Sequence, residues 1–120
     1  MKLINSEYEY FALEFNGMQL GLVWNAFNAE NLERPNISFM ERKTCFLDYL
    51  FRLMSEGKAK FGAQGEFLSG SIEEQLSMLD NIFPKDQEQM EDGLYDGFWF
   101  LTSCQFGIVW INDDGYEDWT

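Results

Sequence analysis

The chain has 120 residues, of which 46% are hydrophobic and 18% aromatic. This is enough apolar material for one continuous core, so we expect a single domain over residues 1–120. Twenty-one Asp and Glu residues oppose eight Lys and Arg residues, which gives a formal net charge of -13. Such a charge repels phosphate backbones and anionic lipids, so it argues against binding to nucleic acid or membranes. Solubility of a chain rich in aromatic residues is the plainer explanation of the charge, and attraction of a basic protein partner is the alternative.

The charge is unevenly distributed along the chain. Residues 34–60 carry six basic and three acidic side chains, a net charge of +3, whereas residues 84–120 carry one lysine and nine acidic side chains, a net charge of -8. The sequence therefore predicts an acidic pole if these two segments lie apart in space.

The first predicted element is a helix over residues 5–15. Its apolar face consists of Tyr8, Phe11, Ala12 and Phe15. Asn16-Gly17 follows and is typical either of a helix end or of a β-hairpin turn, since Met18, Leu20, Leu22 and Trp24 alternate. We favour two helices over residues 8–24, because Val23 is the one β-branched residue from residue 14 to 28, and a hairpin stays open as the alternative.

A long helix is predicted over residues 38–56. Ser38 and Glu41 form a capping-box pattern at its start, and Gly57 follows its end. Asp48 and Arg52 lie one turn apart on the face that we expect to point to solvent. The predicted inward stripe is Met40, Thr44, Leu47, Phe51 and Met54, widened by Phe46, Leu50 and Leu53.

A small strand pair and a second capped helix come next. Residues 58–61 and 66–68 read as strands around a turn at 62–65. Ser71 and Glu74 start a helix that Pro84 ends, and residues 85–97 read as an acidic loop with room for one helical turn. The inward face of this helix is predicted to be Ile72, Leu76, Leu79 and Phe83.

The last segment reads as three strands. We expect strands at 98–102 and 106–111, a turn at 112–115, and a returning strand at 116–119. Residues 108–111 are apolar on both faces, which predicts a strand that is covered on both sides. The resulting fold class is α+β, with helices packed on a small, mostly antiparallel sheet that has a C-terminal aromatic hairpin.

Several kinds of chemistry are excluded by composition. The chain has no histidine, which removes His-dependent nucleophilic catalysis and histidine metal ligands. Cys45 and Cys104 are too far apart in sequence to suggest a zinc site, and the absence of a signal peptide at the start favours two free thiols in the cytoplasm over a disulfide. We expect no cofactor and no metal.

Acidic residues invite two further interpretations, each with a plainer alternative. Residues 112–118 carry many oxygen ligands, but the chain ends before an EF-hand loop is complete, so Asp-Gly turn chemistry is favoured over calcium. Glu73 and Glu74 are better explained by helix capping than by acid–base catalysis. Lys58 and Lys60 after a helix suggest a winged-helix module, which the opposing net charge disfavours.

The aromatic residues divide into a core set and a surface set. We assign Trp24, Phe39, Phe46, Phe51, Phe83 and Phe98 to the core. Trp99 lies beside the acidic hairpin. Rings surrounded by carboxylates suit a surface that binds a basic protein, because the rings are desolvated on contact and the acids accelerate encounter. The predicted partner-binding residues are Trp110, Asp113, Asp114, Tyr116, Glu117, Asp118 and Trp119.

Three blocks of the sequence resemble a known family: GMQLGLVWNAF, FLSGSIEEQLSMLDNIFPK and FWFLTSCQFGIVWINDDGYEDWT. They are similar to a small bacterial family catalogued as domain of unknown function 596. The resemblance implies a place near contact-dependent inhibition or other polymorphic toxin loci, where small acidic proteins act as immunity partners. It implies no catalytic residues.

The leading hypothesis is a non-enzymatic, cytoplasmic immunity-type protein that binds and neutralises a basic toxin domain. One alternative is an acidic adaptor or homodimer whose aromatic hairpin meets its own copy. Another is a small-ligand binder or enzyme that uses carboxylates alone.

Overall fold

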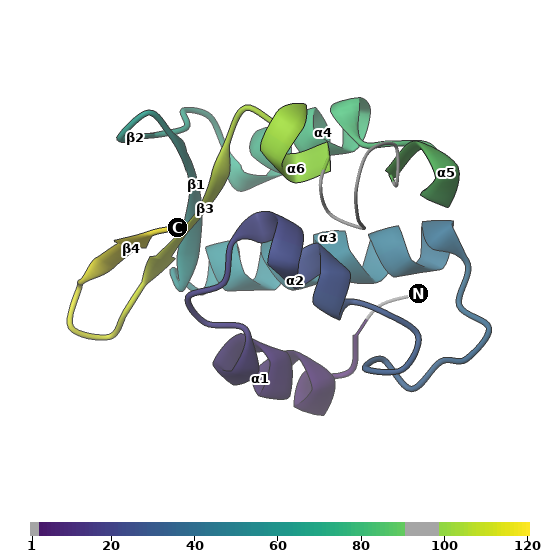
Figure 1. Cartoon of the computed structure of the whole chain (residues 1–120). Helices are drawn as coiled ribbons and strands as arrows, with labels where there is room; N and C mark the ends of the chain where they lie inside the picture. Colours follow the sequence, from purple (N-terminus) through teal and green to yellow (C-terminus); the bar gives the residue numbers. More distant parts are fainter. Residues whose placement is uncertain (1–2, 91–98) are drawn as a thin grey trace.

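The computed structural model describes residues 3–90 and 99–120, and over these residues it contains six helices and four strands packed into one globule (Figure 1). The helices are α1 (Asn5–Glu14), α2 (Leu20–Ala26), α3 (Phe39–Ser55), α4 (Ile72–Ile82), α5 (Gln87–Met90) and α6 (Trp99–Thr102). The strands are β1 (Ala59–Ala63), β2 (Glu66–Phe67), β3 (Gly107–Ile111) and β4 (Glu117–Trp119). The predicted α+β class is confirmed.

The four strands form one antiparallel sheet in the order β2-β1-β3-β4. Ala59 pairs with Trp110 and Phe61 pairs with Ile108, and these four side chains are all buried in the core between sheet and helices. Because neighbouring residues of a strand point to opposite faces, Lys60 and its partner Val109 lie on the outer face. Figure 1 shows the sheet at one side of the molecule, with the helices beyond it.

Helix α3 is the centre of the core. Phe46, Tyr49 and Leu50 are fully buried along it. The Phe46 ring contacts those of Trp24 and Phe27, and the Tyr49 ring contacts that of Phe27. The Trp24 and Phe46 ring centroids lie 5.2 Å apart in an edge-to-face arrangement, and those of Phe27 and Tyr49 lie 5.1 Å apart. Aromatic pairs at these distances stabilise a core beyond the area that they bury.

The predicted inward stripe of α3 is correct for Phe46, Leu50, Leu53 and Met54, which are buried, and wrong for Met40 and Phe51, because the buried face is rotated around the helix. Met40 and Phe51 are 57% and 39% exposed, whereas Arg42 and Tyr49 point inward. The guanidinium of Arg42 lies 3.9 Å from the Trp24 ring centroid and donates a hydrogen bond of 2.6 Å to the Trp24 carbonyl. The Tyr49 hydroxyl donates to the carbonyl of Phe11 at 3.1 Å. The polar groups of Arg42 and Tyr49 both have hydrogen-bond partners inside the fold, so these amphipathic side chains can be part of the core. A search for apolar residues alone does not find them.

The predicted solvent-facing pair on α3 has a structural partner instead. Asp48 and Arg52 form an ion pair of 3.2 Å, and both bind the backbone of Leu3. Leu3 donates its N–H to Asp48 at 3.3 Å and accepts a hydrogen bond of 2.5 Å from Arg52. The pair therefore holds the N-terminal segment on α3, where Leu3 is 2% exposed.

The N-terminal segment forms two helices, so the hairpin alternative for residues 8–24 is excluded. The predicted face of Tyr8, Phe11, Ala12 and Phe15 is buried. Gly17 ends the first helical segment with φ of +88°, a conformation that costs little without a Cβ. The N–H of Ile4, which precedes α1, donates to the Glu7 carboxylate at 3.0 Å.

The two predicted capping boxes and the first strand pair are confirmed. Ser38 and Ser71 each accept a hydrogen bond of 3.1 Å from the backbone of the glutamate three residues later. The turn between β1 and β2 places Gln64 and Gly65 at φ of 55° and 80°, which is the backbone of a type I′ hairpin turn.

The strand predicted over residues 98–102 is wrong. Trp99 to Thr102 form the short helix α6, and Phe98 lies outside the described residues. Strand β3 already pairs with β1 on one side and β4 on the other. The apolar run serves helix packing instead: the Phe100 ring lies 5.9 Å from both Phe46 and Phe83. A short apolar run does not by itself distinguish a strand from a helical turn.

Candidate partner-binding surface

The turn between β3 and β4 is built by its own backbone and by one carboxylate. Asn112 donates its N–H to the Tyr116 carbonyl at 2.9 Å, and Gly115 donates to the Asn112 carbonyl at 2.8 Å. The Asp114 carboxylate accepts the N–H of Tyr116 at 2.9 Å. The Asp-Gly pair therefore performs turn chemistry, and within the described part of the chain no group of three or more His, Cys, Asp or Glu side chains is arranged to hold a metal ion.

The structure leaves five of the seven predicted contact residues exposed, one half-buried and one, Trp110, buried. Asp113, Asp114 and Glu117 are exposed with Tyr116, which leaves 64% of its surface accessible. Trp119 is 39% exposed. Asp118 is half-buried and points to the helix side, where its Oδ2 lies 3.4 Å from the place that a Cβ on Gly17 would occupy.

Trp110 is the predicted contact residue that the structure removes from the surface. It is fully buried and donates its indole N–H to the Met18 carbonyl at 2.9 Å. Its register partner is Ala59, so it faces the helices together with the other core residues of the sheet. Trp110 anchors the hairpin to the body of the protein and is not available to a partner.

Trp119 covers the outer face of the sheet. Its ring stacks on Phe67 with the centroids 5.1 Å apart and an interplanar angle of 20°. The two residues come from the opposite edge strands, β4 and β2, so the pair bridges the strands between them. A Cβ added to Gly62 would lie 2.6 Å from the Trp119 ring, and Val109 is left only 1% exposed. This stacked pair explains how β3 is covered on both faces.

Phe67 is the surface residue that the sequence reasoning missed. Its ring also lies 4.7 Å from the Lys60 ammonium. A glycine inside a strand often marks the close approach of another group, so Gly62 opposite Phe67 was the available signal for an aromatic cover.

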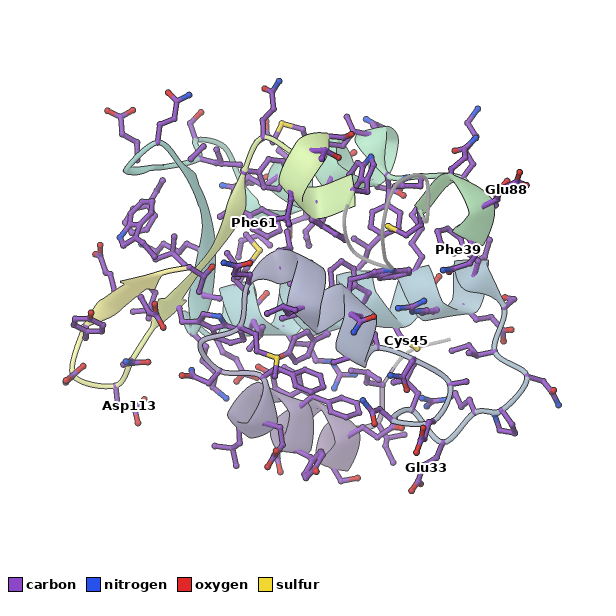
Figure 2. The ribbon with its side chains drawn as sticks, in the orientation of Figure 1. Glu33, Phe39, Cys45, Phe61, Glu88 and Asp113 are labelled. Atoms are coloured by element: carbon purple, nitrogen blue, oxygen red, sulfur yellow. The ribbon has the colours of Figure 1, made fainter. Side chains whose placement is uncertain are left out.

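A second exposed surface surrounds α1. Leu13 and Tyr10 on this helix are 81% and 59% exposed. A groove of about 730 Å³ separates α1 from the loop after α2, and another of about 640 Å³ separates α1 from the β3–β4 turn. Figure 2 shows Glu33 and Asp113 at the two outer sides of α1.

The basic side chains of residues 34–60 are largely engaged within the fold. Lys43 pairs with Asp80 at 2.5 Å, Arg34 with Glu7 at 2.9 Å, and Lys58 with Glu56 at 2.9 Å. Arg42 and Arg52 pack as described above. The predicted basic middle therefore contributes little free positive charge, and the acidic surplus dominates the surface.

The ionisable groups inside the fold serve structure. Hydrogen bonds from the backbone N–H and then the hydroxyl of Ser71 lower the pKa of Glu74, which keeps it ionised as a helix cap. Burial raises the pKa of the thiols of Cys45 and Cys104, and neither cysteine is part of a disulfide. Both effects run against the roles of general acid at neutral pH for Glu74 and nucleophile for the thiols.

Comparison with other proteins identifies a family and a protein of similar structure. The model of a family described as "Protein of unknown function, DUF596" matches residues 54–120. An uncharacterized protein conserved in bacteria, from Neisseria meningitidis, has a similar structure with a TM-score of 0.71. The two chains are 21% identical, and the alignment covers 95% of this chain and 90% of that one. No curated protein matches the chain.

The structural match shows that the fold is shared. Among the helices of residues 3–90 and 99–120, none combines the length and apolar character needed to cross a lipid bilayer.

Proposed function

Because the chain belongs to the DUF596 family of proteins of unknown function, we propose a function from its surface: a non-enzymatic cytoplasmic protein that binds and blocks a basic protein domain. The mode of action is that of an immunity protein, which occupies the working surface of a toxin domain. The net charge of -13 supports a cationic partner, because opposite charges steer encounter and like charges prevent it.

The single observation that carries the proposal is the composition of the β3–β4 turn. It exposes Asp113, Asp114 and Glu117 around the ring of Tyr116, which is 64% exposed. Carboxylates accelerate the approach of a basic surface, and a desolvated ring contributes contact energy once the surfaces meet. The turn is held by its own hydrogen bonds, so these groups are presented with little ordering cost on binding.

The internal roles of the ionisable groups favour binding over catalysis. Glu74 caps a helix, Asp48 holds the N-terminal segment, and both thiols are more weakly acidic than usual. Asp114 and Glu117 are exposed on a protruding hairpin (Figure 1) and line neither groove beside α1, so solvent screens them and a substrate would not be enclosed there.

The test is co-expression with the basic C-terminal domain of a toxin encoded beside the gene for this protein. We expect the wild type to restore growth and to co-purify with that domain. The triple variant Asp113→Asn, Glu117→Gln, Tyr116→Ala should weaken binding by about 100-fold, because several exposed contact groups are lost at once. A matched control removes the same number of charges, two, at exposed positions elsewhere: Glu73→Gln and Glu88→Gln.

Absence of protection and of a complex for the wild type would contradict the proposed function. Equal loss of affinity in the turn variant and in the control variant would show that net charge alone accounts for binding. Circular dichroism spectra and unfolding midpoints of both variants should match the wild type, because all the substituted side chains are exposed.

A further inference from the structure

The outer face of α1 presents apolar side chains to solvent. Its inner face is buried through Tyr8, Phe11 and Ala12, yet Tyr10 and Leu13 on the other side are 59% and 81% exposed. The accessible surface of Leu13 thus remains largely in contact with water, and this is the most exposed large apolar side chain of the described residues. Exposed apolar side chains that lie together and are surrounded by charged groups mark an interaction site more often than single ones do.

The first groove beside this helix has an aromatic base and acidic walls. Phe11 and Phe15, stacked 5.0 Å apart, line it together with Tyr10. Glu7 and Glu14 line it from α1, and Glu30 and Glu33 line it from the loop that follows α2. Rings and carboxylates together recognise a cationic side chain, through the ring face and through charge-assisted hydrogen bonds.

The loop that forms the far wall of this groove is held by backbone hydrogen bonds. Glu33 donates its N–H to the Glu30 carbonyl at 3.1 Å, and Arg34 donates to the Ala29 carbonyl at 3.0 Å. Asn31 is fixed from both sides, by the Asn28 carboxamide at 2.8 Å and the Ala26 carbonyl at 2.9 Å. The wall is therefore preorganised opposite α1.

The second groove connects α1 with the hairpin turn. Glu9 and Leu13 line it from the helix and Asp113 lines it from the turn, and Lys58, whose ammonium is paired with Glu56, lines it as well. Taken together, the two grooves are lined by six carboxylates and one lysine. The first groove is strongly acidic even though Glu7 is paired with Arg34, because Glu14, Glu30 and Glu33 also line it, and the second groove is weakly acidic, with two carboxylates against one lysine.

We propose that the α1 face, defined as Tyr10 and Leu13 with the two flanking grooves, docks a cationic amphipathic segment of the partner protein. Apolar side chains of that segment lie against Tyr10 and Leu13, and its Lys or Arg side chains enter the grooves. This inference rests on the proposed function for the basic character of the partner. It extends the contact from the hairpin turn to α1, with Asp113 shared between the two surfaces.

Charge complementarity selects this occupant over a second copy of the chain. Two α1 faces in contact would bring the carboxylates of both copies together beneath an apolar contact of only two side chains, and each copy carries a net charge of -13. Like charges across an interface oppose association by several kcal/mol. A cationic amphipathic segment can place its apolar side chains on Tyr10 and Leu13 and its Lys or Arg side chains in the grooves at the same time.

The experiment follows the backbone amide NMR signals of the ¹⁵N-labelled full chain during titration with synthetic peptides. The main probe is an 18-residue amphipathic helix of leucine and lysine. The comparison probes are an oligolysine of the same charge and an amphipathic helix of leucine and glutamate. We expect saturable shifts at Glu9, Tyr10, Leu13, Glu14 and Glu33 with the main probe, and an affinity at least tenfold weaker for the comparison probes.

The matched variants are Leu13→Ser on the α1 face and Leu101→Ser on α6, which Figure 1 shows on the opposite side of the molecule. Leu13 and Leu101 are both exposed, 81% and 58%, so neither change should alter the fold. We expect Leu13→Ser to weaken binding of the main probe about tenfold, and Leu101→Ser to leave it unchanged.

Three outcomes would overturn the inference: shifts confined to residues 112–117, equal binding of oligolysine and the main probe, or no binding of the main probe. The first of these leaves the proposed function intact and returns the contact to the hairpin. Failure of the proposed function is distinguishable, because then the peptide binds the α1 face while co-expression gives no protection.

Discussion

The outer face of the sheet and the outer face of α1 both expose large apolar side chains, yet only one of them has an internal reason to do so. Trp119 and Phe67 are 39% and 38% exposed, and their stacked rings cover Gly62 and Val109. Leu13 is 81% exposed. The rings of Trp119 and Phe67 pack against the sheet on one side and contact solvent on the other. The side chain of Leu13, in contrast, is accessible to solvent over most of its area.

This difference decides how an exposed aromatic should be interpreted. A ring that fills the space above a strand glycine contributes to folding, and its exposed edge follows from geometry. A single exposed leucine needs no explanation by itself, but Leu13 lies next to Tyr10 and between two grooves with acidic linings, and this combination favours a role in binding. Substitutions on the two faces should therefore separate stability from affinity.

The largest expected effect comes from filling the space that Trp119 occupies. Gly62→Val places a Cβ 2.6 Å from the Trp119 ring and 3.0 Å from Val109, so the ring must leave its position or the strands must shift. We expect a loss of about 3 kcal/mol in the free energy of unfolding, measured in guanidinium chloride.

The matched control for Gly62 is its register partner on β3. Among the described residues, no heavy atom lies within 4 Å of a Cβ added to Gly107. Gly107→Ala should change the free energy of unfolding by less than about 1 kcal/mol. Equal destabilisation by both substitutions would mean that strand geometry, and not the aromatic cover, is responsible.

A smaller loss is expected when the cover itself is removed. Trp119→Ala deletes the stacking on Phe67 and exposes Val109, but part of the ring already contacts solvent. We expect about 2 kcal/mol of destabilisation, below the range for fully buried aromatic residues. Trp119→Phe should restore part of that loss. A change near zero for Trp119→Ala would show that the stack is only a surface contact and free to bind a partner.

The same comparison shows which features were predictable from sequence. The first residues of α3 and α4 were predictable, because Ser38 with Glu41 and Ser71 with Glu74 satisfy the free backbone donors at the start of each helix. The antiparallel pairing of β3 with β4 was also predictable, since Asp114 and Gly115 act within the turn itself. Features of this kind can be predicted from a sequence because the residues that interact are neighbours in the chain.

Features that depend on distant partners were not predictable. The rotation of α3 depends on the Trp24 carbonyl, which accepts a hydrogen bond from Arg42, and on the Phe11 carbonyl, which accepts one from Tyr49. Trp110 was placed at the surface because its turn is acidic, yet its indole reaches Met18, 92 residues away. The α1 face was not predictable because part of its acidic lining comes from the loop at residues 30–33, and no local sequence pattern indicates that this loop lies beside α1.

Like the exposed apolar side chains, the carboxylates fall into two groups: some have a structural role within the fold, and others are accessible to a partner. The dependence of protein stability on pH distinguishes the two groups. The pKa of Glu74 is lowered from its ordinary value of 4.5 by hydrogen bonds from Ser71. A group whose pKa is depressed on folding adds stability above its unfolded pKa, and that stability is lost as the pH falls through the folded pKa. We expect wild type to be more stable than Glu74→Gln at pH 7, with the difference disappearing below about pH 4.5.

The measurement is the difference between the two unfolding curves at each pH, since the whole chain also loses negative charge on acidification. The control is Glu73→Gln, one residue away and exposed in the same helical turn. A difference between wild type and Glu74→Gln that stayed constant from pH 7 to pH 3 would contradict the assignment of Glu74 as an ionised cap.

The smallest expected effect on stability belongs to the α1 face. Leu13→Ala removes a side chain that is 81% exposed, so little buried apolar area is lost, and alanine has the better helix propensity. The free energy of unfolding should change by less than about 0.5 kcal/mol. The same substitution should weaken binding of the amphipathic leucine–lysine peptide, because the contact area of the ridge is removed. A loss of more than about 1 kcal/mol in the free energy of unfolding would show that Leu13 already packs within the fold. The α1 face would then resemble the outer face of the sheet, where the exposed side chains serve the fold and not a partner.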